Sequence, residues 1–142
     1  MLIYLDICCF NRPFDDQSQT RIRFETEARL ELQERVRQKK VGLVWSYMLD
    51  FENKQNPFPE RAASILLWRN LAEVRVGETA SVLDRGRSLM SLGIKPFDAL
   101  HVACAIMAGA DLFITTDDAL LRKLRGYRYL RRIPGKTIPG EV

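Results

Sequence analysis

The order of hydrophobic segments in this sequence predicts an α/β domain, with a mostly parallel sheet covered on both faces by helices. Short apolar runs of the kind found in buried strands alternate along the chain with longer segments of helical periodicity. The length of 142 residues suits one domain with a substantial core and is short for two. We therefore expect residues 1–142 to form a single domain, with an irregular tail from about residue 134.

Local signals bound the predicted elements. Thr20 is a candidate helix cap, Pro96 suits a first helical turn, and Gly93 and Gly109 suit helix ends. Residues 11–19, rich in Asp, Asn, Gln and Ser, have loop composition. The expected strands are 2–5, 41–46, 72–76, 112–115 and 129–133, and the expected helices are 20–40, 47–53, 59–71, 78–92, 96–109 and 117–124.

The overall composition, with 46% hydrophobic and 28% charged residues, is that of a soluble globular protein. No apolar run approaches the roughly 18–20 residues of a membrane span, and the N-terminus does not resemble a signal peptide. The three cysteines form no Cys-x-x-Cys pair, so they do not predict a zinc knuckle. We expect a cytoplasmic protein without a membrane partner.

The net charge of +4 permits a polyanionic partner without requiring one. Basic residues are concentrated near the C-terminus, where Tyr127 and Tyr129 lie among them. This segment is either a solvated basic tail or a weak nucleic-acid contact. The candidates for such a contact are Arg122, Lys123, Arg125 and Arg128.

Acidic residues follow the predicted strands at positions where a parallel sheet brings them together. Asp6 ends the first strand, Asp117 follows the strand at 112–115, and Asp98 lies in the first turn of the helix between them. Strand carboxyl ends and helix amino ends lie at the same end of such a sheet, which is where ligands bind. We expect Asp6, Asp98 and Asp117 to converge, with Glu52 reaching in from a neighbouring helix. Taken singly, each residue also suits a cap, a first helical turn or a solvated helix face.

Carboxylates crowded in a partly desolvated site repel one another, and a bound cation removes that cost. Hard carboxylate oxygens without clustered His or Cys favour Mg²⁺ or Mn²⁺. The chemistry that this suggests is metal-assisted hydrolysis of phosphodiesters. His101 lies one helical turn after Asp98 and is either a general base, a phosphate contact or a packed helix residue.

Other polar residues lie near the same strand ends and have structural alternatives. Asn11 is a candidate to hold a water or an acid, and Arg12 is a candidate phosphate contact. Ser46 is expected to cap a helix. The possible auxiliary residues of the site are Asn11, Arg12, Ser46, Thr115, Thr116 and Asp118.

Four motifs in order give the sequence a resemblance to the PIN domain family, which includes the toxin nucleases of bacterial toxin–antitoxin pairs. They are IYLD ending at Asp6, WSYMLDFE with Ser46 and Glu52, FDALHVACA with Asp98, and FITTDD with Asp117. The segment from DALHVA to FITTDD is the most specific. The resemblance covers about four-fifths of the chain.

This resemblance implies a three-layer α/β/α sandwich. It also implies that Asp6, Glu52, Asp98 and Asp117 are the metal-binding catalytic acids of a Mg²⁺- or Mn²⁺-dependent endoribonuclease that cuts single-stranded RNA. Proteins of this kind often form homodimers, and the toxins are held inactive by a partner antitoxin.

Two departures from the family pattern leave alternatives open. Ile7 and Cys8 stand where the family usually has Thr-Asn, which suggests a catalytically impaired module that binds RNA or protein. Asp50 lies two residues before Glu52, although the interval from Ser46 favours Glu52 as the second acid. A hydrolase of small phosphoesters is a third alternative. The basic C-terminal segment mildly favours a polymeric substrate over a small one.

Overall fold

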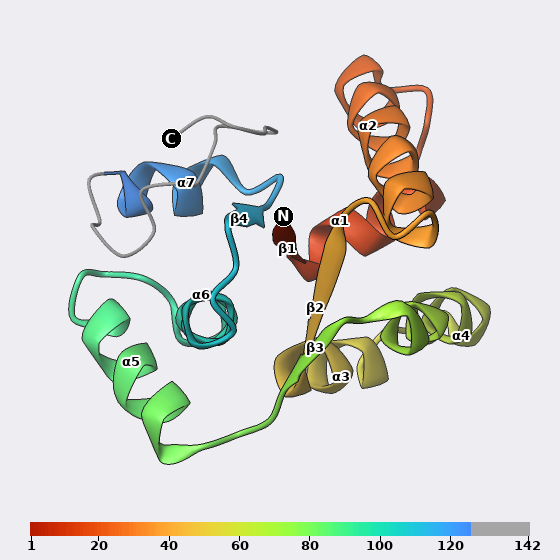
Figure 1. The fold of residues 1–142 in the computed structure, drawn as a ribbon. Helices are drawn as coiled ribbons and strands as arrows, with labels where there is room; N and C mark the ends of the chain where they lie inside the picture. The colour runs from red at the N-terminus through yellow and green to blue at the C-terminus, as the bar shows by residue number, and fades with distance from the viewer. Residues whose placement is uncertain (126–142) are drawn as a thin grey trace.

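The computed structural model describes residues 1–125 and has a four-stranded, all-parallel sheet at its centre (Figure 1). The strands are β1 (Leu2–Leu5), β2 (Gly42–Ser46), β3 (Val74–Val76) and β4 (Leu112–Ile114). Their order across the sheet is β3-β2-β1-β4, so β1 lies between β2 and β4. The predicted α/β class is therefore confirmed, and the residues that follow β1 and β4 are neighbours in space.

Helices connect the strands and cover both faces of the sheet. They are α1 (Ile7–Asn11), α2 (Thr20–Arg37), α3 (Tyr47–Lys54), α4 (Pro59–Leu66), α5 (Ala80–Met90), α6 (Pro96–Met107) and α7 (Asp118–Leu124), with the 3₁₀ turns η1 (Arg12–Phe14) and η2 (Leu67–Leu71). None of these helices combines the length and apolar character that crossing a membrane requires.

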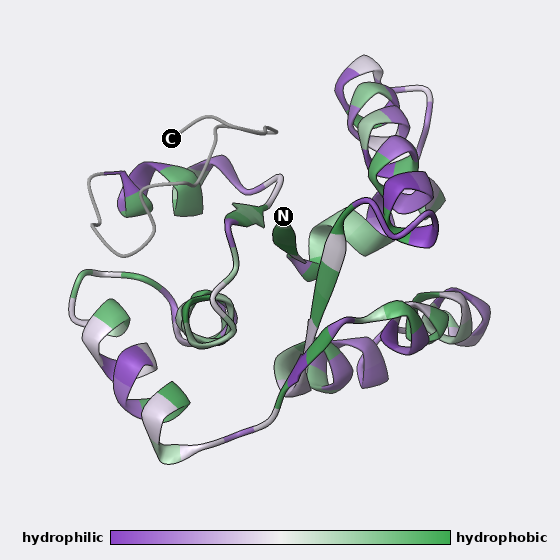
Figure 2. Ribbon diagram, viewed as in Figure 1, coloured by the Kyte–Doolittle hydropathy of each residue, from purple (hydrophilic) through white to green (hydrophobic). Residues whose placement is uncertain are grey.

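Successive side chains of β1 point to opposite faces of the sheet and so contact different layers of helices. Tyr4 contacts His101 of α6, whereas Ile3 and Leu5 line pockets together with Ala28 and Leu32 of α2. This gives the three-layer α/β/α arrangement that was expected. Figure 2 shows that β1, β4 and α6 are largely hydrophobic, and half of the residues of α6 are buried. The buried residues Ala99 and 101–105 pack α6 into the core, and this packing positions Asp98 in the first turn of the helix.

Several predicted boundaries are wrong for identifiable reasons. The expected loop from residue 11 contains η1, and α1 begins directly after Asp6 because the Asp6 carboxylate accepts a hydrogen bond from the Ile7 N–H and caps the helix. Thr20 does not cap α2, whose N-cap is Gln19 without a side-chain bond. The helix expected over 59–71 is divided into α4 and η2.

Smaller differences affect the ends of other elements. The third strand is limited to Val74–Val76, and α2 ends at Arg37. The cap of α7 is Asp117, whose carboxylate accepts a hydrogen bond from the Leu120 N–H. The strand expected over 129–133, the tail from about 134 and Arg128 lie outside the described residues.

Candidate functional site

The four predicted acids gather at the carboxyl end of the sheet. Asp6 follows β1, Asp117 follows β4, Asp98 lies in the first turn of α6 and Glu52 lies on α3. The charges of the other three all act on Asp98. The topology thus brings together residues that are separated by up to 111 positions in the sequence, as the parallel order of strands predicts.

Asp98 is the least compensated of these acids. Among residues 1–125, its carboxylate has no hydrogen-bond or ion-pair partner, although the residue is partly buried. Burial, followed by the charges of Asp6 and Asp117, raises the pKa of Asp98 to about 6, and His101 opposes this shift. The site therefore carries more negative charge than its protein surroundings neutralise.

Asp6 is buried and held by two hydrogen bonds, one to each carboxylate oxygen. Oδ1 accepts from the Ile7 N–H at 2.8 Å, and Oδ2 accepts from the Thr115 hydroxyl at 2.8 Å. The same hydroxyl oxygen accepts from the Asp117 N–H at 3.1 Å. Thr115 therefore links the ends of β1 and β4 and fixes the spacing of Asp6 and Asp117.

Glu52, and not Asp50, lies beside the other acids. The Glu52 carboxylate accepts a hydrogen bond from His101 Nε2, and the same nitrogen is 3.9 Å from Asp6 Oδ1. Asp50 instead accepts a hydrogen bond from Trp45 Nε1 at 3.0 Å and lies 3.5 Å from Arg69. Positions two apart on a helix face different directions, and here they face different partners.

His101 is a packed and hydrogen-bonded helix residue, one of the alternatives considered for it. It is 1% exposed, and Nδ1 lies 2.6 Å from the Tyr4 hydroxyl. Burial lowers the pKa of His101, but the hydrogen bond to Glu52 and the charge of Asp6 together raise it by more, so the net shift is upward. Tyr4 was not among the residues predicted from the sequence. Its place in β1, on the same face as α6, is the signal that would have identified it.

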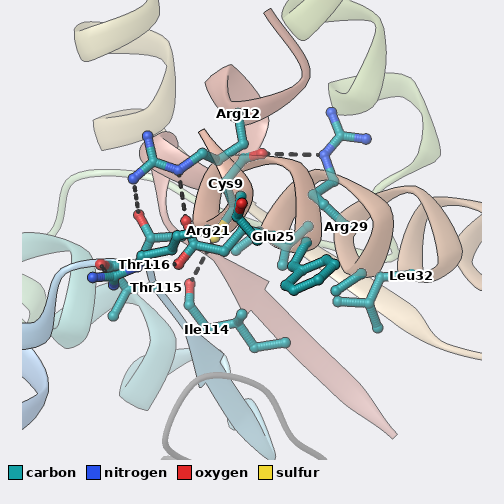
Figure 3. A pocket seen from close by; sticks show the side chains of 13 residues that line it. Cys9, Arg12, Arg21, Glu25, Arg29, Leu32, Ile114, Thr115 and Thr116 are labelled. Atoms are coloured by element: carbon teal, nitrogen blue, oxygen red, sulfur yellow. Dashed lines mark hydrogen bonds and ion pairs between the residues drawn. The ribbon is translucent and has the colours of Figure 1, made fainter. Parts of the chain in front are cut away.

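Arg12 is already engaged by carboxylates, so its charge is compensated within the protein. Its guanidinium bonds Asp15 and Glu25 at 2.9 Å each and donates to the Thr116 hydroxyl at 3.2 Å. Figure 3 shows Arg12 reaching toward Glu25 and Thr116 at the edge of a pocket of about 640 Å³ between α2 and the end of β4. Arg21 pairs with Asp118 at 3.0 Å. These contacts tie α2 to the segment that carries Asp117.

The remaining auxiliary candidates have structural partners. Ser46 caps α3 by accepting from the Leu49 N–H at 3.2 Å, as predicted. The side-chain oxygen of Asn11 accepts from Asn56 and Arg61 at 3.3 and 3.4 Å. The basic candidates Arg122, Lys123 and Arg125 are exposed at the end of α7.

A comparison with protein-family models matches residues 24–126, well over half of the chain, to the PIN domain. The chain belongs to the PIN domain family. PIN domains are generally nucleases, and they generally use divalent metal ions. The match includes Glu52, Asp98 and Asp117 but begins after β1, so the place of Asp6 in this PIN domain rests on the sheet topology.

The PIN domain is also similar in structure to VapBC2 from Rickettsia felis, solved with a DNA fragment from its promoter. The TM-score is 0.60 and the sequence identity is 15%, and the alignment covers 92% of this chain and 96% of the other. At this identity the likeness supports the fold. A search of curated proteins finds no match.

Proposed function

We propose that this PIN domain is a Mg²⁺- or Mn²⁺-dependent endoribonuclease that hydrolyses phosphodiester bonds of single-stranded RNA. The observation that carries the proposal is the Asp98 carboxylate, which lacks a partner within residues 1–125 and is surrounded by Asp6, Glu52 and Asp117. Burial and the neighbouring carboxylates raise the pKa of Asp98, and a bound divalent cation would offset that repulsion.

The donor set fits a hard divalent cation in charge and chemistry. Among residues 1–125, no three His, Cys, Asp or Glu side chains are arranged to hold a metal ion as they stand. Each oxygen of Asp6 accepts one hydrogen bond and retains a lone pair for a further contact. Asp6, Asp98, Asp117 and Glu52 are the residues that would hold the ion after side-chain adjustment. When bound, the ion lowers the pKa of water and neutralises charge on the phosphate.

The residues of the chain hold two of the acids in position. Thr115 fixes Asp6 and Asp117 relative to each other. Because Asp6 and Asp117 are already held in place, this pair loses less conformational entropy when it receives a ligand.

Two exposed aromatic rings beside the acids support an unpaired strand as substrate. Phe51 and Phe97 directly precede Glu52 and Asp98, are 43% and 46% exposed, and contact each other edge to face with centroids 5.4 Å apart. Exposed aromatic rings stack on unpaired bases without sequence preference. The basic residues at the end of α7 add positive charge suited to a phosphate backbone.

We further propose that the protein is the toxin of a toxin–antitoxin pair, acts as a homodimer in the cytoplasm and is inhibited by an antitoxin protein. The likeness to VapBC2, a protein solved with promoter DNA, motivates the toxin–antitoxin part of this proposal. All three cysteines are free, which is consistent with a reducing compartment.

Cleavage of a labelled single-stranded RNA tests the proposed reaction. We expect cutting with Mn²⁺, none with EDTA, and none with Asp98→Asn in the presence of Mn²⁺. Parallel reactions with double-stranded RNA, single-stranded DNA and a small aryl phosphate define the substrate class. Cleavage that continues in EDTA would exclude the metal-dependent mechanism.

A second candidate function is an RNA-binding or protein-binding module with impaired chemistry. Cys8 lies 3.5 Å from the Thr115 hydroxyl, so a thiol contacts the residue that orients Asp6. This alternative predicts salt-sensitive RNA binding without cleavage in any divalent metal. Restoration of cleavage by Cys8→Asn would favour impaired chemistry.

Glu52 and Asp50 provide a matched pair of variants. If Glu52 helps to hold the ion, Glu52→Gln should lower the rate of RNA cleavage at limiting Mn²⁺ by at least about 100-fold, because losing a negative ligand should cost no less than losing a residue that only supports a ligand. Asp50→Asn should keep the rate within about twofold, since an amide oxygen can still accept the Trp45 bond. Initial rates over a Mn²⁺ titration measure both. Equal effects of the two changes would contradict the assignment of Glu52.

A further inference from the structure

A buried line of polar side chains connects the cap of α3 to the Glu52 carboxylate. The Leu49 N–H donates to Ser46 Oγ at 3.2 Å, and Ser46 Oγ lies 2.6 Å from the Tyr4 hydroxyl. The Tyr4 hydroxyl lies 2.6 Å from His101 Nδ1, and His101 Nε2 contacts Glu52. The line therefore runs through β2, β1 and α6 and ends among the acids.

The inner members of this line cannot contact a substrate. Tyr4, Ser46 and His101 are each no more than 1% exposed, and the Tyr4 ring stacks on Phe113 with centroids 5.4 Å apart. A polar group buried to this extent costs free energy unless it is hydrogen-bonded. The line therefore acts on a substrate only indirectly, and Glu52, which His101 contacts, is its partly exposed member.

The partners of His101 determine where its ring carries a proton. Nε2 faces two carboxylates, Glu52 in contact and Asp6 at 3.9 Å, and a carboxylate only accepts hydrogen bonds. Nε2 must therefore be the donor. In a neutral imidazole, Nδ1 is then the acceptor, and it takes the hydrogen of the Tyr4 hydroxyl. Nε2 remains the donor to Glu52 if the ring is charged.

We infer that His101 is a positioning residue that orients Glu52 toward the metal site, and that Tyr4 fixes the His101 ring for this task. The inference rests on the proposed metal-dependent function and names residues outside the set of acids. Glu52 has three rotatable bonds and is partly exposed, so without a fixed donor its carboxylate would sample conformations that face solvent. Partners of this kind behind a metal ligand typically contribute 10–100-fold to metal affinity.

The experiment combines Mn²⁺ affinity with the protonation of the ring. His101 is the only histidine in the chain, so nitrogen-15 NMR of untagged protein reports on this one ring without assignment. We expect a proton on Nε2. By calorimetry, His101→Leu should weaken Mn²⁺ binding by about 10–100-fold. His101→Gln, which retains a donor toward Glu52, should recover most of the affinity, and Tyr4→Phe should cause a smaller loss than His101→Leu.

Two controls separate this inference from folding and from the proposed function. Thermal unfolding in EDTA identifies variants that do not fold. If His101→Leu does not fold, the Mn²⁺ affinities of Tyr4→Phe and His101→Gln relative to wild type test the positioning role instead. If wild type binds no Mn²⁺, or Asp98→Asn binds it equally well, the proposed metal-dependent function fails. If Asp98→Asn loses Mn²⁺ but His101→Leu binds it as tightly as wild type or more tightly, only the positioning role fails. An Nε2 atom that carries no proton in the NMR spectrum would also overturn the positioning role of His101.

Discussion

Replacement of Asp6 by asparagine is expected to lower the rate of RNA cleavage at saturating Mn²⁺ by at least about 1,000-fold. A metal ion contributes several kcal/mol to stabilising the charge of the transition state, and each 1.36 kcal/mol corresponds to about a factor of ten in rate. Asp6 lies at the centre of the sheet edge, where Thr115 fixes it, so no neighbouring acid can take its place. Single-turnover cleavage of a labelled RNA measures the effect.

Asp111→Asn is the matched control for this change. Asp111 precedes β4 at the opposite end of the sheet, and its carboxylate accepts a hydrogen bond from the Leu2 N–H at 2.8 Å, much as Asp6 accepts from Ile7. In both variants an amide oxygen can accept the backbone bond, and in Asp6→Asn the Thr115 hydroxyl can turn to accept from the amide N–H, so both should fold. We expect Asp111→Asn to cleave within about twofold of the wild-type rate. Cleavage by repeatedly purified Asp6→Asn at the wild-type rate would show that the activity resides elsewhere.

The sheet and the convergence of acids could be predicted because they depend on features that are local in the sequence. The apolar runs of β1, β2 and β4 are short and bounded by polar residues, and parallel topology then places Asp6 beside Asp117 without knowledge of side-chain contacts. Pro96 and the apolar character of α6 likewise indicated where the helix carrying Asp98 begins.

The short helix α1 and the partners of the acids could not be predicted in the same way. Asp6 caps α1 by accepting a hydrogen bond from the N–H of the next residue. The loop composition of the residues after Asn11 gives no sign of this short helix. The contact of His101 with Glu52 joins residues 49 positions apart on different helices. Such contacts depend on how helices pack across the sheet, which periodicity alone does not specify.

The buried position of Arg29 is a further example of this limit. The sequence places a cation on an amphipathic helix, where solvent exposure is the ordinary expectation. In the structure Arg29 is buried, with its guanidinium 4.8 Å from the Trp68 ring centroid and 5.5 Å from that of Phe10. It also donates to the carbonyl oxygen of Cys9. Aromatic faces and a backbone carbonyl from distant segments make this burial favourable.

In the absence of metal, Asp98→Asn is expected to stabilise the protein at neutral pH by about 1–2 kcal/mol, a range that allows for solvent screening of this half-buried carboxylate. Burial and the charges of Asp6 and Asp117 raise the pKa of Asp98 from 3.8 to about 6 in the folded state. The folded protein therefore binds this proton more tightly than the unfolded chain does. Stability should fall as pH rises from about 4 to about 6 and stay low above that range, and the amide variant should lack this component.

Urea unfolding of wild type and Asp98→Asn in EDTA at pH 4 and pH 7.5 measures the effect as a difference between the two proteins. The difference in unfolding free energy should be near zero at pH 4 and should favour the variant at pH 7.5, whereas Asp84→Asn, an exposed control on α5, should show no such change. Saturating Mn²⁺ should reverse the order at pH 7.5, because a ligand at 100 times its Kd stabilises the protein that binds it by about 2.7 kcal/mol. A variant that is less stable than wild type in EDTA would show that the Asp98 carboxylate is compensated within the protein. The acidic cluster would then not require a cation, and the observation on which the proposed function rests would be lost.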